Sequence, residues 1–379
     1  MKIILFIFSL NIFLINNILL GNDENIILPK TMVWSTYGLA ASSYGEASAF
    51  AEALMHNYNM RVRLKPSGTA IGRLLPLKKK KVSIAFLGSE SFFASEGIYD
   101  FAAKSWGPQN LRVIMARPNT FGIAVAANTN IHKIEDLKGK KIAYVTANPS
   151  VNVKVEAIIS FADLSWDDVT KVIYPAFSPT IKALQTGKVD AAGAVPTGPA
   201  VYELASSKKG IRWLNMPKDN TEGWKKLQNV IPFMHPQIEN LGAGLSEDNT
   251  VELGGYRYPT LTVYADASEE IIYNFIKAID LTYDSFKNIT PVMYKWSLKL
   301  AIGTPVDAPI HNGTIKYLKE KNLWSKEDEK WNNKRIKRLD TLIDGWKIFL
   351  AKNKDLEDKE FKIKWLKERK LLLAKFLRQ

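Results

Sequence analysis

From Met32 onward, the chain alternates short apolar runs with segments whose apolar residues recur at helical spacing. The run at 31–35 predicts a first strand. Ala47, Phe50 and Leu54 then repeat at steps of three and four, which is typical of an amphipathic helix. The run at 82–87 predicts another strand after an intervening helix. An alternation of strands and helices is typical of an α/β protein with a parallel sheet.

The same order of elements returns in the second part of the chain. The segments 121–127, 171–174 and 189–194 predict strands, and amphipathic helices lie between them. Two such units in one chain predict an α/β fold with two lobes. We place the first part of lobe 1 at 28–118, lobe 2 at 119–222, a return to lobe 1 with C-terminal helices at 223–350, and a charged amphipathic helical tail at 351–379.

Residues 1–22 have the pattern of a secretory signal peptide. Lys2 precedes a long apolar run, and such a segment is removed on export. The alternative is an uncleaved membrane anchor, because the run approaches the roughly 18 residues that a spanning helix needs. Asn11, Asn16 and Asn17 interrupt the run and favour the signal peptide. We therefore expect an exported protein of the periplasm.

The composition is that of a globular protein without cysteine. Of the 379 residues, 46% are hydrophobic and 24% are charged, which suffices for two compact lobes. The lack of cysteine excludes disulfides, thiolate metal sites and a lipid anchor on an N-terminal cysteine. The formal charge of +14 fits a nucleic acid, a membrane surface, an anionic ligand or simply a lysine-rich surface. No nucleic-acid-binding motif accompanies the basic residues, so we expect no nucleic acid partner.

Loops rich in small and hydroxyl residues follow the predicted strands in both units. Ser43 and Glu46 match the capping box of a helix start, and a helix N-terminus suits an anion because its N–H groups are free. Ligands of open parallel sheets bind beyond the carboxyl ends of the strands. Two sheets that face each other would therefore form one cleft. The alternative is that these loops are ordinary capped turns.

The candidate ligand-binding residues come from both units and from the crossing between them. Arg117 lies at that crossing, and a guanidinium presents a fork of donors to a carboxylate. A solvated surface arginine is the alternative. The full set is Tyr37, Ser42, Ser43, Tyr44, Ser67, Gly68, Thr69, Ser89, Arg117, Asn148, Ser150, Asn152 and Thr197.

The sequence lacks the usual signals of enzymatic chemistry. His56, His132, His235 and His311 are isolated and do not have the spacing of metal ligands. The chain has no Walker loop, no Gly-x-Ser-x-Gly elbow and no His-Glu-x-x-His motif. We therefore predict a binding protein without catalytic residues, metal or cofactor.

The segment 361–379 carries seven Lys or Arg residues against one Glu. Phe361, Trp365, Leu372 and Phe376 recur in it at helical steps. A basic amphipathic helix of this kind can lie on a membrane surface or on a partner helix. The alternative is a terminal helix that docks on its own protein.

Several longer motifs together resemble one known family. They are AASSYGEASAFAEAL at 40–54, KPSGTAIGRLLPLKKKKVSIAFLGS at 65–89, IEDLKGKKIAYV at 134–145, TIKALQTGKVDAAGAV at 180–195 and GTIKYLKEKNLWSKEDEKWNN at 313–333. In these segments the chain resembles the TAXI-type solute receptors of tripartite ATP-independent periplasmic (TRAP) transporters.

The resemblance implies a two-lobed periplasmic-binding-protein fold of type II, a Venus flytrap, here with a helical C-terminal extension. It also implies capture of a small organic anion, a carboxylate or an amino acid, and delivery to the membrane permease subunit of a TRAP transporter. The ligand loops carried over are Ser42–Tyr44, Ser67–Thr69 and 148–152. The family's double glycine is Ala40-Ala41 in this chain, and the added methyl groups narrow the approach to a ligand. We therefore expect a substrate different from glutamate.

Three alternatives remain at the level of sequence. A receptor of an ABC importer would share the fold, and an enzyme on the same lobes would turn over a bound metabolite. A surface interaction protein would bind no small ligand at all.

Overall fold

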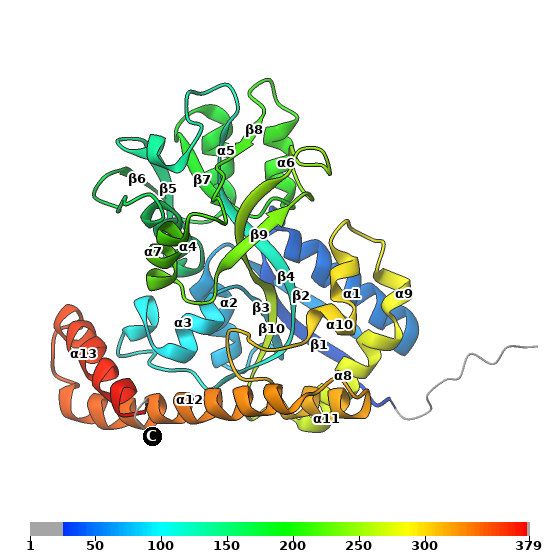
Figure 1. The fold of residues 1–379 in the computed structure, drawn as a ribbon. Helices are drawn as coiled ribbons and strands as arrows, with labels where there is room; N and C mark the ends of the chain where they lie inside the picture. Colours follow the sequence, from blue (N-terminus) through cyan, green and yellow to red (C-terminus); the bar gives the residue numbers. More distant parts are fainter. Residues whose placement is uncertain (1–25, 377–379) are drawn as a thin grey trace, which may run out of the picture.

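The computed structural model describes residues 26–376, which form two lobes joined by two long strands (Figure 1). These strands are β4 (Leu111–Ala126) and β10 (Val251–Tyr264), which pair antiparallel with each other and pass from one lobe into the other. The predicted signal peptide at 1–22 lies outside the described residues. No helix among residues 26–376 is long and apolar enough to cross a membrane.

The first lobe is built on a sheet in the order β2-β1-β3-β10-β4. Strand β1 (Thr31–Tyr37) lies parallel to β2 (Arg61–Ser67) and β3 (Ile84–Leu87), whereas β10 is antiparallel to β3. Buried parallel strands are expected to be apolar on both faces, and β3 is buried along its whole length. The main helices of this lobe are α1 (Ser42–Tyr58), α2 (Ala70–Lys78), α3 (Glu90–Glu96), α8 (Glu269–Leu281) and α11 (Asn312–Glu320).

The second lobe repeats the architecture around β5 (Lys141–Val145), β6 (Thr170–Tyr174) and β7 (Ala191–Ala194). These strands are parallel to one another, and β7 is antiparallel to the second half of β4. The edges carry β8 (Ile211–Trp213), which pairs with β4, and β9 (His235–Glu239), which pairs with β10. The helices are α4 (Pro149–Ser160), α5 (Ser178–Thr186), α6 (Pro199–Ala205) and α7 (Thr221–Val230).

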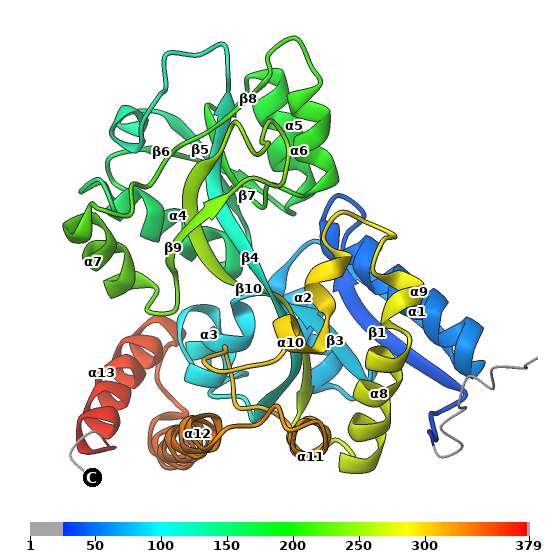
Figure 2. The ribbon, with the colours of Figure 1, turned by 45° about the vertical axis from the view of Figure 1, so that its right-hand side comes forward.

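The return to the first lobe lies later in the chain than the sequence suggests. Helix α7 begins near the expected boundary at 223 but lies in the second lobe in both views (Figures 1 and 2). There it packs on α4, with the Trp224 ring edge-on to Phe161 at 5.6 Å between centroids. The chain crosses back only along β10, so the expected boundary at 223 is wrong for this segment.

The start of α1 also differs from the expected capping box. The helix begins at Ser42, its N-cap residue is Ala41, and no side chain caps it. The Glu46 carboxylate instead accepts hydrogen bonds from Arg117 and from the indole N–H of Trp296. The expected reciprocal cap of Ser43 and Glu46 is therefore wrong, because a buried arginine takes the carboxylate.

The C-terminal extension consists of α12 (Lys326–Asn353) and α13 (Asp358–Phe376), which lie under the first lobe (Figure 2). Phe361 and Trp365 of α13 are fully buried, and the Trp365 ring stands edge-on to Trp346 of α12 at 4.7 Å. The indole N–H of Trp365 donates to the carbonyl of Gly97. The alternative of a helix docked on its own protein is thus the one that the structure supports.

One buried carboxylate fixes this extension to α3. Glu96 pairs with Arg335 and Arg338 of α12 and with Arg369 of α13. Burial raises the pKa of Glu96, but the hydrogen bond from Arg338 and the positive charges of the three arginines outweigh it and lower the pKa to about 2. The remaining short elements are η1 (Tyr99–Ala102), η2 (Ile134–Leu137), α9 (Tyr283–Phe286), η3 (Met293–Trp296) and α10 (Leu298–Ala301).

Candidate functional site between the lobes

A small cavity lies where the two lobes meet, and both lobes and both connecting strands line it. Its volume of about 30 Å³ leaves room for roughly two water molecules. Its walls are mostly apolar. The lining residues are Tyr37, Ala40, Ala41, Ser42, Phe121, Ser150, Val151, Lys154, Phe177, Ile181, Val195, Gly198, Ala200, Val201, Tyr256 and Tyr258.

Helices from both lobes begin at this cavity. Ser42 is the first residue of α1, and Ser150 lies in the first turn of α4. Phe177 is the N-cap residue of α5. The unpaired N–H groups at helix starts carry partial positive charge. Their convergence on one cavity favours an anion in it.

Lys154 of α4 places an amine on the cavity wall, and this amine is positively charged below its pKa. The residue is 2% exposed, and its Nζ lies 4.2 Å from the ring centroid of Tyr256 and 4.5 Å from that of Phe121. Burial lowers its pKa to about 7, and the charges of Glu90 and Asp307 oppose this change. Among the described residues, no hydrogen bond or ion pair within 4 Å joins Lys154 to an acceptor. A buried cation without an anionic partner is costly in an apolar interior.

Several buried polar atoms around the cavity have no hydrogen-bond partner among the described residues. In natural proteins such atoms are rare, because each carries a desolvation cost. Two of them belong to lining residues, and the others lie on the loops just behind the wall. They are the hydroxyls of Ser42, Ser89, Thr197 and Tyr256 and the amide oxygen of Asn148.

The tyrosines on β10 remain neutral at this site and can donate hydrogen bonds through their hydroxyl groups. Burial raises the pKa of Tyr256 and of Tyr258 well above the ordinary value of 10, so both hydroxyls carry their protons at neutral pH. Tyr258 donates to the hydroxyl of Ser43 at 3.2 Å. Tyr256 also lines the cavity; Asn119 acts on its hydroxyl oxygen and opposes the rise in pKa, whereas the hydroxyl proton has no acceptor among the described residues.

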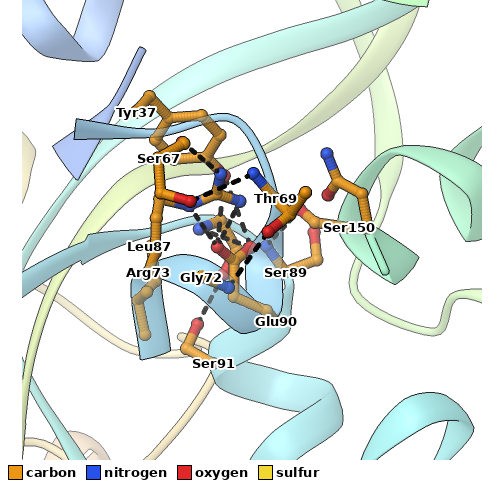
Figure 3. Close-up of polar contacts among 12 residues, drawn as sticks. Tyr37, Ser67, Thr69, Gly72, Arg73, Leu87, Ser89, Glu90, Ser91 and Ser150 are labelled. Carbon is orange, nitrogen blue, oxygen red and sulfur yellow. Dashed lines mark hydrogen bonds and ion pairs between the residues drawn. The ribbon is translucent and has the colours of Figure 1, made fainter. Parts of the chain in front are cut away.

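A buried ion pair supports the floor of the site in the first lobe (Figure 3). Arg73 Nη2 and Glu90 Oε1 are 2.6 Å apart, and both side chains are fully buried. The guanidinium carbon lies 3.5 Å from the centroid of the Tyr37 ring, whose hydroxyl donates to Glu90 at 3.3 Å. Arg73 holds the pKa of Glu90 below its ordinary value, against the effect of burial. The pair orients Tyr37 and is already neutralised within the protein.

Arg117 is engaged in the same way and does not line the cavity. Its Nε and Nη2 donate to the two carboxylate oxygens of Glu46 at 2.6 and 2.7 Å, and both side chains are fully buried. A bidentate pair of this kind satisfies both partners. The expectation that Arg117 would take a ligand carboxylate is therefore at odds with its contacts.

The loops of the two lobes touch beside the cavity. Ser89 N donates to Ser150 Oγ at 3.1 Å, as Figure 3 shows, and Phe177 N donates to the carbonyl of Gly68 at 3.3 Å. A side-chain carbon on Gly68 would lie 2.8 Å from Cβ of Ala176. Ser67 and Thr69 cap the start of α2. The loop 67–69 thus forms the contact between the lobes instead of the cavity wall.

The other predicted residues fall into three groups. Tyr37, Ser42 and Ser150 line the cavity, and Ser43, Ser89, Asn148 and Thr197 lie directly behind its wall. Asn152 is turned away, because its amide bonds to both the N–H and the carbonyl of Val145. Tyr44 does not line the cavity either.

Sequence reasoning missed Lys154, Phe121 and Tyr256 as wall residues. Lys154 did leave a signal, because it interrupts the apolar run of Val151, Val153 and Val155 at the start of a predicted helix. A lysine on such a face is almost never fully buried without a reason. Among the described residues, no group of three His, Asp or Glu side chains is placed to hold a metal ion.

The comparison with protein families fits this architecture. The model of the NMT1-like family matches residues 43–321, which include most of both lobes, whereas β1 and the wall residues Tyr37, Ala40, Ala41 and Ser42 precede the match. The chain belongs to the NMT1-like family. In this member of the family, the match ends before α12 and α13, so the C-terminal extension lies outside the matched segment.

Solved structures of similar proteins show low identity to this NMT1-like protein. A protein from Bordetella bronchiseptica RB50 is 17% identical over 79% of this chain and 91% of its own, with a TM-score of 0.46. The alkanesulfonate-binding protein SsuA from Xanthomonas axonopodis pv. citri, bound to MOPS, is 15% identical over 79% of this chain and 96% of its own (TM-score 0.44). An ancestral arginine-binding protein bound to arginine is 16% identical over 69% and 98% (TM-score 0.42).

Proposed function

We propose that this protein is an extracytoplasmic solute-binding protein that captures a small organic anion between its lobes and delivers it to a membrane permease. The observation that carries the proposal is the cavity between the lobes, on which the buried amine of Lys154 and unpartnered hydroxyls converge. A bound anion would compensate the buried charge and satisfy those hydroxyls. No bond is made or broken in this function.

The mechanism follows from where the wall residues come from. Ser42 and Tyr37 belong to the first lobe, whereas Ser150 and Lys154 belong to the second. A ligand that touches both sets binds only the closed form tightly, so it shifts the population toward closure. Bending of β4 and β10, the two strands shared by the lobes, is the motion that this requires.

The permease partner is part of the proposal. The resemblance to TAXI-type receptors supports a TRAP permease driven by an ion gradient, and residues 1–22 support export to the periplasm. Receptors of ABC importers remain the competing class. Solute uptake into proteoliposomes that contain the permease encoded beside this protein distinguishes the two classes. Uptake by a TRAP system responds to an imposed ion gradient, whereas uptake by an ABC importer responds to ATP.

Blocking the cavity tests the proposed function directly. Ser42→Phe fills the space at the start of α1, so we expect it to abolish ligand-induced thermal stabilisation in a screen of organic acids, amino acids and sulfonates. Ser206→Phe is the matched control, because Ser206 is an exposed residue of the second lobe far from the lining. An unchanged ligand response in the Ser42 variant would remove this cavity from the function.

A further inference from the structure

The charges around the cavity specify how many negative groups a ligand can bring. Among the described residues that line it, Lys154 is the only charged one. Arg73 and Arg117 are each paired with a buried glutamate, so neither is available as a second cation. One free cation matches one anionic group, because a second carboxylate in an apolar cavity would stay uncompensated.

The polar groups of the wall specify what else the ligand carries. Lys154 donates through its ammonium group, and the unpartnered hydroxyls of Ser42 and Tyr256 are both able to donate. No carboxylate lines the cavity, and Glu90 is already engaged by Arg73, Tyr37 and the N–H of Gly88. A ligand ammonium would therefore find no anionic partner. A site made of donors fits a ligand made of acceptors.

The rest of the wall limits size and polarity. Val151, Ile181, Val195 and Val201 face the cavity from the second lobe, and Ala40 and Ala41 close it from the first. The space left between them, about 30 Å³, holds only about two water molecules. An organic solute therefore enters only if the lobes part, and its end remote from Lys154 must be compact and apolar.

We propose that the ligand is a compact monocarboxylate with an oxo or hydroxyl group at C2, whose carboxylate pairs with Lys154 Nζ, and that amino acids and dicarboxylates are rejected. This inference rests on the proposed function and narrows its ligand class. The C2 oxygen accepts from the hydroxyl of Ser42 or Tyr256, and the short alkyl end packs on the valines. Lys154 is thereby the residue that determines the charge of the ligand.

Ligands that share one carbon skeleton test this inference. We expect 2-oxoisovalerate and 2-hydroxyisovalerate to bind the full mature chain in titration calorimetry at least about 30-fold more tightly than valine, in which an ammonium replaces the C2 oxygen. The same preference is expected over 2-oxoglutarate, which adds a second carboxylate. Lys154→Met should weaken binding of the oxo acid by about 100-fold or more. Lys218→Met, a change of an exposed lysine of the second lobe that does not line the cavity, should leave it unaltered.

The outcomes separate this inference from the proposed function. Binding of valine or 2-oxoglutarate as tightly as the oxo acid overturns the monocarboxylate inference and leaves the binding function intact. An oxo-acid affinity that survives Lys154→Met also overturns it. If none of these ligands binds, and a broad screen of metabolites produces no thermal shift, then the proposed function itself fails.

Discussion

Replacing Lys154 by methionine should stabilise the ligand-free protein while it removes ligand binding. The pKa of Lys154 falls from an ordinary value of 10.5 to about 7 on burial. At roughly 1.4 kcal/mol per pKa unit, this corresponds to a cost of about 5 kcal/mol at neutral pH. Methionine has a similar length and no charge, so it removes that cost.

Part of this gain is lost with the aromatic contacts of the ammonium group. Nζ lies within 4.5 Å of the ring centroids of Tyr256 and Phe121, and a desolvated cation–π contact contributes about 2 kcal/mol. The variant should therefore gain about 3 kcal/mol in free energy of unfolding, within the range seen when apolar groups replace buried charges. Such a gain would mark Lys154 as a residue kept for function at the expense of stability.

Urea unfolding, followed by tryptophan fluorescence, measures the free energy of unfolding. The protein is first unfolded and refolded so that no bound solute remains. The pH provides a second check. Because the folded pKa lies below the unfolded one, the unfolded chain binds more protons between pH 7 and 10.5. The cost of burying Lys154 is therefore complete below its folded pKa of about 7 and shrinks as the pH rises toward 10.5.

Two results would refute this reasoning. One is a Lys154→Met variant that is no more stable than the wild type at pH 7. The other is a stability difference that stays constant up to pH 9.5, where we expect the gain of about 3 kcal/mol to have almost vanished. Lys182→Met serves as the control and should change the stability by less than about 0.5 kcal/mol.

Two further predictions concern pH and the C-terminal extension. Affinity for a monocarboxylate should fall by about tenfold between pH 6 and pH 8, because Lys154 loses its proton around its pKa of about 7. Burial raises the pKa of Asp307 to about 7, so this carboxylate becomes negative over the same range. Calorimetry at several pH values measures this, and an affinity that is flat or that rises with pH would contradict it. Trp365→Ala should destabilise the docking of α13 by about 3–5 kcal/mol, because it empties a fully buried site between Trp346 and Phe349. Hydrogen exchange should then show α13 opening while the affinity for the ligand changes little, and unchanged protection of α13 would argue against the contact.

Much of the fold could be predicted from the chain, because its short strands have local signatures. The strands β1, β3 and β7 are apolar runs between helices, and the expected runs overlap them. The long strands β4 and β10 were harder to predict. The middle of β4 contains Arg117, Pro118 and Asn119, which are poor strand formers on their own. Their conformation depends on pairing with β10, more than a hundred positions away in the chain.

The site shows the same division between local and distant causes. Ser42 and Ser150 lie on the cavity wall because helix starts follow strand ends in this architecture, which is a local rule. Arg117 could not be placed in this way, since its partner Glu46 reaches it only through the tertiary fold. Lys154 was missed for the opposite reason. Its type favours the surface, and only the packing of Phe121 and Tyr256 around it shows that it is buried.

The distance between the two lobes in solution tests the central claim most directly. The chain contains no cysteine, so Glu52→Cys on α1 and Lys208→Cys in the second lobe give two specific sites for spin labels. The account predicts a broad distribution of distances without ligand and a single shorter distance when 2-oxoisovalerate, or whichever solute binds, is present. The same distribution with and without a tightly bound solute would contradict capture by closure of the lobes.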